Sequence, residues 1–193
     1  LTPLIKLMEH IIQTYDVAYA DETTLQVLKE KDKKATTKSY MWLFIGGPPS
    51  RRSFIYAYHP TRAARVAGDF FKAFEGYLHA DCYNAYTLLG TQEDITHVAC
   101  MAHARRYFFD ITRQTKKKKG LAFQVVELIG KLYHLEKRLK EEKATPEHIK
   151  HMRQQGAVPI LSKIKILLDG NVAKVPPQGP LAKAMHYMLT HWK

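Results

Sequence analysis

The hydrophobic pattern of the N-terminal half switches between helical and strand-like spacing several times. Apolar residues recur at helical spacing from Leu4 to Ile12, which predicts an amphipathic helix. Three strand-like runs follow, at about 17–28, 40–45 and 53–58. The connections between them are short, being charged or rich in glycine and proline. Neighbouring strands joined in this way favour an antiparallel meander.

Helical and strand-like segments then alternate. We expect a helix from Ala64 to about Phe74, a strand at 77–80, a short helix at 86–89, a strand at 95–100 and a helix at 102–112. A meander followed by strands added through helical crossovers gives a mixed sheet with helices on its faces. The pattern therefore predicts an α/β protein with a ribonuclease-H-like mixed five-stranded sheet flanked by helices.

Beyond Lys119 the spacing of apolar residues is helical only. Four helices are expected, at about 121–135, from about 145, at 158–168 and at 181–189. We therefore expect two domains. Residues 1–119 would form the ribonuclease-H-like core, preceded by the N-terminal helix, and residues 120–193 an all-helical insertion region.

The charge of the chain indicates a polyanionic partner. Lysine and arginine number 30 against 18 aspartates and glutamates, which gives a formal net charge of +12. This balance favours DNA or RNA. Two cysteines cannot build a disulfide framework, and no signal peptide or membrane-length apolar run is present, so we expect a cytoplasmic protein without a membrane partner. Because the sequence begins at Leu1 rather than methionine, we expect a fragment of a longer protein.

Two aspartates are the main candidates for catalysis. Asp21 and Asp81 each lie where a strand-like run stops being apolar. An unpaired buried carboxylate is costly unless a cation compensates it, and magnesium prefers such hard oxygen ligands. The pair thus indicates a shared Mg²⁺ or Mn²⁺ site for phosphoryl transfer on a nucleic acid. Ordinary cap or turn aspartates are the alternative.

Basic residues in the region after residue 100 are candidates for phosphate contact. Arg105 and Arg106 begin a predicted helix, and guanidinium groups pair well with phosphates, although a solvated helix face explains them equally. The run Lys116, Lys117, Lys118 and Lys119 offers four adjacent charges for a DNA backbone, or forms a soluble loop. We predict that both groups bind nucleic acid.

Two further groups have a simpler structural interpretation. Cys100 and His103 are zinc-ligand types, but four ligands are normally needed, so a buried thiol and a hydrogen-bonded histidine remain the default. A supporting role for them beside the carboxylates is a hypothesis. Trp42, Tyr56 and Tyr58 alternate with apolar residues, which favours strand packing over base stacking.

Several phrases of the sequence, in this order and spacing, resemble bacterial insertion-sequence 66 family transposases. They are 20–28 (ADETTLQVL), 74–86 (FEGYLHADCYNAY), 100–108 (CMAHARRYF) and 177–189 (PQGPLAKAMHYML) followed by Trp192. The resemblance implies a DNA transposase that uses an Asp-Asp-Glu triad and two magnesium ions to cleave and transfer strands. Asp21 and Asp81 match the first two carboxylates, and Cys100 and His103 lie in a phrase near the active site. Transposon ends, target DNA and other copies of the protein are the implied partners.

One departure from the family pattern bears on activity. The third carboxylate of the family lies in an Asn-Asn-x-x-Glu-Arg-like segment that does not occur before Lys193. We therefore expect this fragment to keep the fold and lose most turnover. Glu22 would point to the opposite strand face from Asp21, and Glu127, Glu136 and Asp169 have charged or helical settings typical of surface carboxylates.

Two alternatives to a transposase remain. One is a non-catalytic DNA-binding or assembly module on the same fold. The other is a ribonuclease-H-like nuclease or resolvase, which would share the aspartate pair but would not need the helical region after Lys119.

Overall fold

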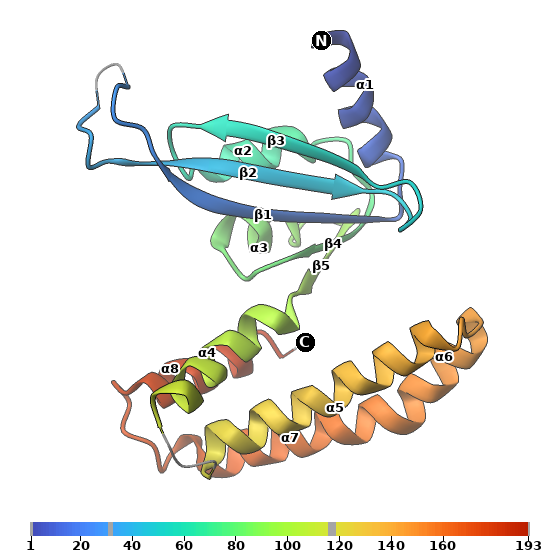
Figure 1. Cartoon of the computed structure of the whole chain (residues 1–193), viewed down its shortest axis with the longest axis vertical. Helices are drawn as coiled ribbons and strands as arrows, with labels where there is room; N and C mark the ends of the chain where they lie inside the picture. The colour runs from blue at the N-terminus through green and yellow to red at the C-terminus, as the bar shows by residue number, and fades with distance from the viewer. Residues whose placement is uncertain (1, 31–32, 116–118, 193) are drawn as a thin grey trace. The chain divides into compact units, whose positions relative to one another are not determined.

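The computed structural model describes residues 2–30, 33–115 and 119–192. Two compact units make up the chain, Leu1–Cys100 and Met101–Lys193. The first contains α1 (Thr2–Gln13), β1 (Val17–Gln26), β2 (Lys38–Gly46), β3 (Ser53–His59), α2 (Ala64–Phe70), β4 (Gly76–Ala80), α3 (Asn84–Leu89) and β5 (Ile95–Ala99). The second contains α4 (Met101–Gln114), α5 (Leu121–Glu141), α6 (Pro146–Met152), a π-helical turn (Arg153–Ala157), α7 (Val158–Val172) and α8 (Pro180–Thr190) (Figure 1).

The five strands form one mixed sheet in the order β3-β2-β1-β4-β5. The first three strands form the antiparallel meander, while β4 pairs with β1 and β5 pairs with β4 in parallel. Parallel neighbours need crossover connections, and here α2 and α3 lie in the two segments that supply them. The predicted α/β class and the five-stranded mixed sheet with helices are therefore confirmed.

The core of the first unit lies on one face of this sheet. Fully buried strand residues such as Ala18, Trp42 and Leu78 pack in one cluster with side chains from the α2 and α3 segments, among them Phe71 and Tyr86. The end of α1 belongs to the same cluster through Ile12, and a side chain at Gly46 would meet Ile12 at 3.0 Å. Close approach of helix and strand therefore requires glycine there.

The opposite face of the sheet carries exposed aromatic side chains. Tyr56 and Tyr58 are 66% and 46% exposed, whereas Trp42 is completely buried. The register explains the difference, because Tyr56 lies opposite Leu43 on β2, one position away from Trp42. The prediction of strand packing is right for Trp42 and wrong for the two tyrosines.

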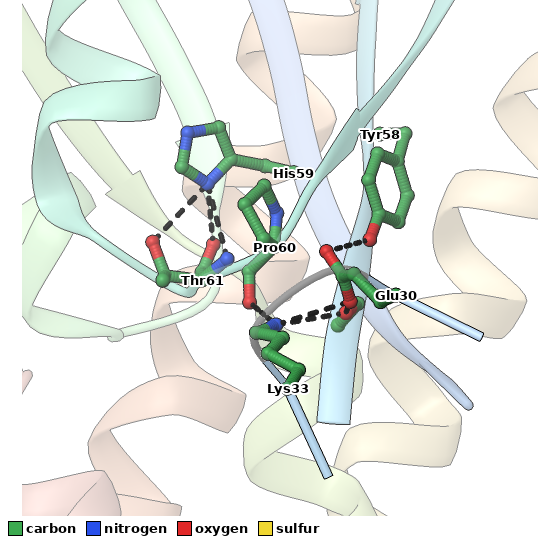
Figure 2. Close-up of polar contacts among 7 residues, drawn as sticks. Glu30, Lys33, Tyr58, His59, Pro60 and Thr61 are labelled. Carbon is green, nitrogen blue, oxygen red and sulfur yellow. Dashed lines mark hydrogen bonds and ion pairs between the residues drawn. The ribbon is translucent and has the colours of Figure 1, made fainter. Parts of the chain in front are cut away.

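A polar cluster fastens the β1–β2 connection to the end of β3 (Figure 2). Glu30 accepts hydrogen bonds from the Tyr58 hydroxyl at 2.5 Å and the buried Ser39 hydroxyl at 2.7 Å. Lys33 donates to Ser39 at 3.0 Å and to the carbonyl of Pro60. The bonds that Glu30 accepts from Tyr58 and Ser39, followed by its interaction with Lys33, hold the pKa of Glu30 below its ordinary value. The segment that follows β3 is thereby tied to the sheet.

The second unit is helical throughout and has its own apolar core. Its α4 contacts α5 and α8, and α5 contacts α7. Fully buried members of this core include Phe108, Ile129, Leu168 and Met185. The predicted start of α6 is confirmed, since Thr145 caps it by accepting a hydrogen bond from the His148 N–H at 3.3 Å.

The division between the units falls after Cys100, because α4 packs with the later helices. The domain boundary at 119/120 expected from the sequence stays a prediction. None of the described helices is both long and apolar enough to cross a membrane.

Candidate active site and basic surface

Asp21 lies in the middle of β1, and its side chain is exposed. The predicted strand at about 17–28 is confirmed, since β1 continues past Asp21 to Gln26 with the polar residues that an exposed strand tolerates. Asp21 is opposite Leu43 of β2, and its Oδ1 accepts a hydrogen bond from the Glu22 N–H at 2.9 Å. The carboxylate is therefore presented from a paired strand.

Asp81 directly follows β4, as the sequence predicts, and is partly buried. Its Oδ1 accepts a hydrogen bond from the Tyr83 N–H at 2.9 Å, which makes a local turn into α3. The Asp81 carbonyl lies 3.0 Å from Nε2 of His97 on β5. Both the carboxylate and the backbone of Asp81 thus have defined partners.

The pairing of β1 with β4 brings the two aspartates to corresponding positions. The parallel register aligns Ala18 with Leu78 and Tyr19 with His79. The pairing itself ends at Tyr19 and His79, and two residues further along each chain come Asp21 on β1 and Asp81 directly after β4. Burial and the hydrogen bond to Glu22 raise the pKa of the Tyr86 hydroxyl most. The negative charges of Asp81 and Asp21 raise it further, so both carboxylates act on this one hydroxyl. Two residues sixty positions apart in the sequence therefore share one region.

Glu22 points to the opposite face from Asp21, which confirms the sequence-based expectation. Its side chain is 2% exposed and accepts hydrogen bonds from Nε of Arg62 at 2.6 Å, from Nη2 of Arg62, and from the Tyr86 hydroxyl at 2.5 Å. Arg62 is a partner that the sequence pattern does not predict. An acidic residue next to Ala18 and Ala20 on a core face is the signal that a partner must exist, because an unpaired buried charge is costly.

Burial and charge act in opposite directions on this pair. Burial raises the pKa of the Glu22 carboxyl, and the Asp81 charge adds to the rise, while the bonds from Tyr86 and Arg62 oppose it. Burial also lowers the pKa of the Arg62 guanidinium, but the bond to Glu22 together with the charges of Glu22, Asp81 and Tyr83 more than offsets this and raises the pKa above its ordinary value. The Asp81 charge acts on both groups, so the pair lies within electrostatic reach of the candidate site.

The donor set at Asp21 and Asp81 fits a hard divalent cation held in part by other oxygens. Magnesium commonly uses one or two carboxylates and completes its shell with water and substrate phosphate. In the described ranges, no group of three or more histidine, cysteine, aspartate or glutamate side chains is arranged to hold a metal ion. The two carboxylates would therefore hold an ion weakly. The same observation gives no support to a zinc site at Cys100 and His103.

The structure separates the supporting pair along the chain. Cys100 ends the first unit, where its N–H donates to the Ala80 carbonyl at 2.9 Å. His103 belongs to α4 of the second unit, and its Nδ1 is buried without a hydrogen-bond partner among the described residues. The structure therefore assigns neither residue to the carboxylates.

Among the predicted DNA contacts, Arg106 and Lys119 are exposed. Arg105 is half-buried, with its guanidinium 4.8 Å from the centre of the Phe109 ring. Lys116, Lys117 and Lys118 lie outside the described residues. Exposed cations on α4 and before α5 are available to phosphate groups.

The excess positive charge belongs entirely to the second unit. Residues 1–100 contain 11 lysines and arginines and 11 aspartates and glutamates, for a net charge of zero. Residues 101–193 contain 19 basic and 7 acidic residues, for a net charge of +12. The formal net positive charge of the sequence therefore lies in the helical unit.

The fold and the site together define an α/β protein whose mixed sheet carries two carboxylates on neighbouring parallel segments. The family model described as Transposase IS66 family matches residues 1–193, and the chain belongs to that family. The family resemblance seen in the sequence is thereby confirmed.

Three curated relatives come from Sinorhizobium fredii (strain NBRC 101917 / NGR234). "Uncharacterized protein y4jD" is 27% identical over 100% of this chain and 39% of its own length. "Uncharacterized protein y4qI" is 28% identical over 89% of this chain and 33% of its own length. "Uncharacterized protein y4hP" is 24% identical, and the match covers 100% of this chain and 38% of that relative. The chain thus spans between a third and two fifths of the relatives it matches. No solved structure matches the chain.

Proposed function

We propose that this chain forms the ribonuclease-H-like core of a DNA transposase, with Asp21 and Asp81 as the first two carboxylates of an Asp-Asp-Glu site. One observation supports the proposal most: β1 and β4 pair in parallel, with Asp21 two residues beyond Tyr19 and Asp81 two residues beyond its pairing partner His79. Family membership supports DNA transposition as the process. The strand order, with a meander joined to two parallel strands, supports the ribonuclease-H-like assignment.

The two aspartates differ in what they contribute. Asp21 is exposed on a paired strand, so its carboxylate is accessible from solvent. Asp81 is fixed by the Tyr83 N–H and, through its carbonyl, by His97. A bound Mg²⁺ or Mn²⁺ supplies charge stabilisation and an activated oxygen nucleophile for an in-line displacement at phosphorus. The carboxylates of Asp21 and Asp81 would position that ion by directing their negative charge toward it.

The helical unit supplies the attraction for DNA. Two carboxylates repel a phosphate backbone, whereas the +12 charge of residues 101–193 attracts it. We assign phosphate contacts to Arg105, Arg106 and the Lys116–Lys119 run. Transposon ends and target DNA are the proposed partners, together with other copies of the protein in a transposition complex.

The third carboxylate of the family has no counterpart among these 193 residues. With only two carboxylates, we expect this chain alone to bind Mg²⁺ or Mn²⁺ weakly and to show negligible DNA cleavage. If it binds DNA and never cleaves it in any longer form, a non-catalytic DNA-binding module becomes the better description.

Strand cleavage by the longer parent protein tests the proposal. Asp21→Asn and Asp81→Asn keep the side-chain shape and remove the charge, so release of a 3′-hydroxyl at the element end should fall by about two orders of magnitude or more. Asp69→Asn is the matched control, because Asp69 is an exposed aspartate on α2. Full cleavage by either of the first two variants would refute their assignment as metal ligands.

A further inference from the structure

A buried ion pair lies next to the loop that carries Asp81. The Glu22 side chain is 2% exposed and that of Arg62 is 39% exposed. Arg62 gives Glu22 two N–H donors, and the Tyr86 hydroxyl supplies a third donor. The Glu22 carboxylate is therefore fully engaged on the core face of β1, while Asp21 occupies the other face.

Arg62 connects this pair to the turn that holds Asp81. Its guanidinium lies over the Tyr83 ring, 3.7 Å from the ring centre, and the Tyr83 hydroxyl donates to the carbonyl of Arg62. The Tyr83 N–H is the donor to the Asp81 carboxylate. Side chain, ring and backbone thus form one continuous chain of contacts from Glu22 to Asp81.

The segment that presents Arg62 is itself anchored just before the residue. Lys33 donates to the Pro60 carbonyl, and the Thr61 N–H donates to Nδ1 of His59 at 3.1 Å (Figure 2). These two bonds fix the backbone just before Arg62, while the Glu22 carboxylate and the Tyr83 ring hold its guanidinium. The hydrogen-bonded cluster at the end of β3 therefore helps to fix where the backbone of Arg62 lies.

We propose that Glu22 and Arg62 are positioning residues that hold Tyr83, and through its N–H the Asp81 carboxylate, in the orientation that binds a divalent cation. The proposal rests on the proposed function of Asp81. Partners that orient metal ligands commonly affect metal affinity by about 10- to 100-fold. Lysine cannot replace Arg62, because it lacks the planar fork that reaches Glu22 and the flat face that stacks on Tyr83.

A purely electrostatic effect of Arg62 on the site predicts the opposite change in Mn²⁺ affinity for Arg62→Gln. Arg62 is a cation near the site, so its removal by Arg62→Gln should strengthen Mn²⁺ binding if charge is all that matters. A positioning role predicts weaker binding. The two explanations are therefore separated by the direction of the change.

The test is Mn²⁺ affinity, measured by electron paramagnetic resonance, together with amide hydrogen exchange at Tyr83. We expect Arg62→Gln to weaken Mn²⁺ binding by about 10-fold or more and to accelerate exchange of the Tyr83 amide, and Arg62→Lys to do the same. Arg65→Gln is the matched control, since Arg65 is exposed on α2. The double variant Glu22→Gln with Arg62→Met leaves no unpaired buried charge and should show the same loss if Arg62→Gln does not fold.

Two results would overturn the positioning role by itself. One is tighter or unchanged Mn²⁺ binding in Arg62→Gln, and the other is a Tyr83 amide that exchanges at the wild-type rate in that variant. Unchanged Mn²⁺ affinity in Asp81→Asn would instead overturn the proposed function of Asp81.

Discussion

The two units of this chain differ in how they use charge. Residues 1–100 are electroneutral and build a sheet that carries two candidate metal ligands, whereas residues 101–193 are helical and hold the whole net charge of +12. An acidic site repels the phosphate backbone that it would have to cleave. Under the proposed function, attraction of the DNA and chemistry on it would therefore belong to different parts of the chain.

Ion pairs follow the same division. In the first unit, the Glu22 side chain is 2% exposed in its pair with Arg62, so this charge is built into the core. In the second unit, Glu136 and Arg153 form a two-point contact, but their side chains remain 44% and 55% exposed. The Glu22–Arg62 pair of the first unit therefore contains a buried carboxylate, whereas both side chains of the Glu136–Arg153 pair of the second unit lie at the surface.

The largest expected change is in the free energy of unfolding, and it should come from a cavity made in one of the two cores. Phe108 is fully buried in the helical core, so Phe108→Ala should lower the free energy of unfolding by about 3–5 kcal/mol. Amide hydrogen exchange should accelerate in the second unit and stay unchanged in β1 and β2. Trp42→Ala is the reciprocal variant, since Trp42 is fully buried in the other core. Equal acceleration in both units would show that they unfold as one.

The next largest expected change is in the salt dependence of DNA affinity, which should differ between variants of the two units. Replacing Lys116–Lys119 by alanine should flatten the dependence of affinity on salt, because each lost phosphate contact removes about 0.9 from the slope for duplex DNA. Four exposed lysines of the first unit, Lys6, Lys34, Lys38 and Lys72, form the matched control. Their replacement should leave the slope nearly unchanged. An equal change in both sets would end the assignment of DNA attraction to the second unit.

The smallest effect concerns the exposed pair in the second unit. Arg153 holds the pKa of Glu136 below its ordinary value of 4.5, so the charged form is favoured in the folded state. Its contribution is present above pH 4.5 and is lost as the pH falls through the lower folded pKa. Because the pair is solvent-exposed, Glu136→Gln should cost only about 0.5 kcal/mol near pH 7. Thermal unfolding of both proteins should converge at acid pH, and a constant difference would assign the effect to packing.

The order of helices and strands could be predicted from the sequence because periodicity reports which face of an element is buried. The Thr145 cap followed by Pro146 predicted the start of α6, and the structure confirms it. The end of α5 was placed six residues too early, although Leu139 is buried and extends the same stripe. Composition within short windows is a weak guide to where a long helix stops.

Long-range partners could not be predicted in this way. Glu22 and Arg62 are 40 residues apart, and nothing in their local sequences names one as the partner of the other. The same holds for Tyr56 and Tyr58, whose alternation fits either face of the sheet until the register with β2 is known. The parallel pairing of β1 with β4 could be predicted because the order of crossovers constrains which strands can pair, whereas a site shared by Asp21 and Asp81 stays a prediction.

The most direct test of the central claim is a titration of this chain with Mn²⁺, followed by electron paramagnetic resonance. The account predicts weak binding of Mn²⁺ that both Asp21→Asn and Asp81→Asn reduce to a similar extent, with Asp69→Asn unchanged, because one ion uses both carboxylates. The double variant should lose little more than either single variant, since the two side chains act on one site. Independent, additive losses, or binding that survives both substitutions, would contradict a shared metal site.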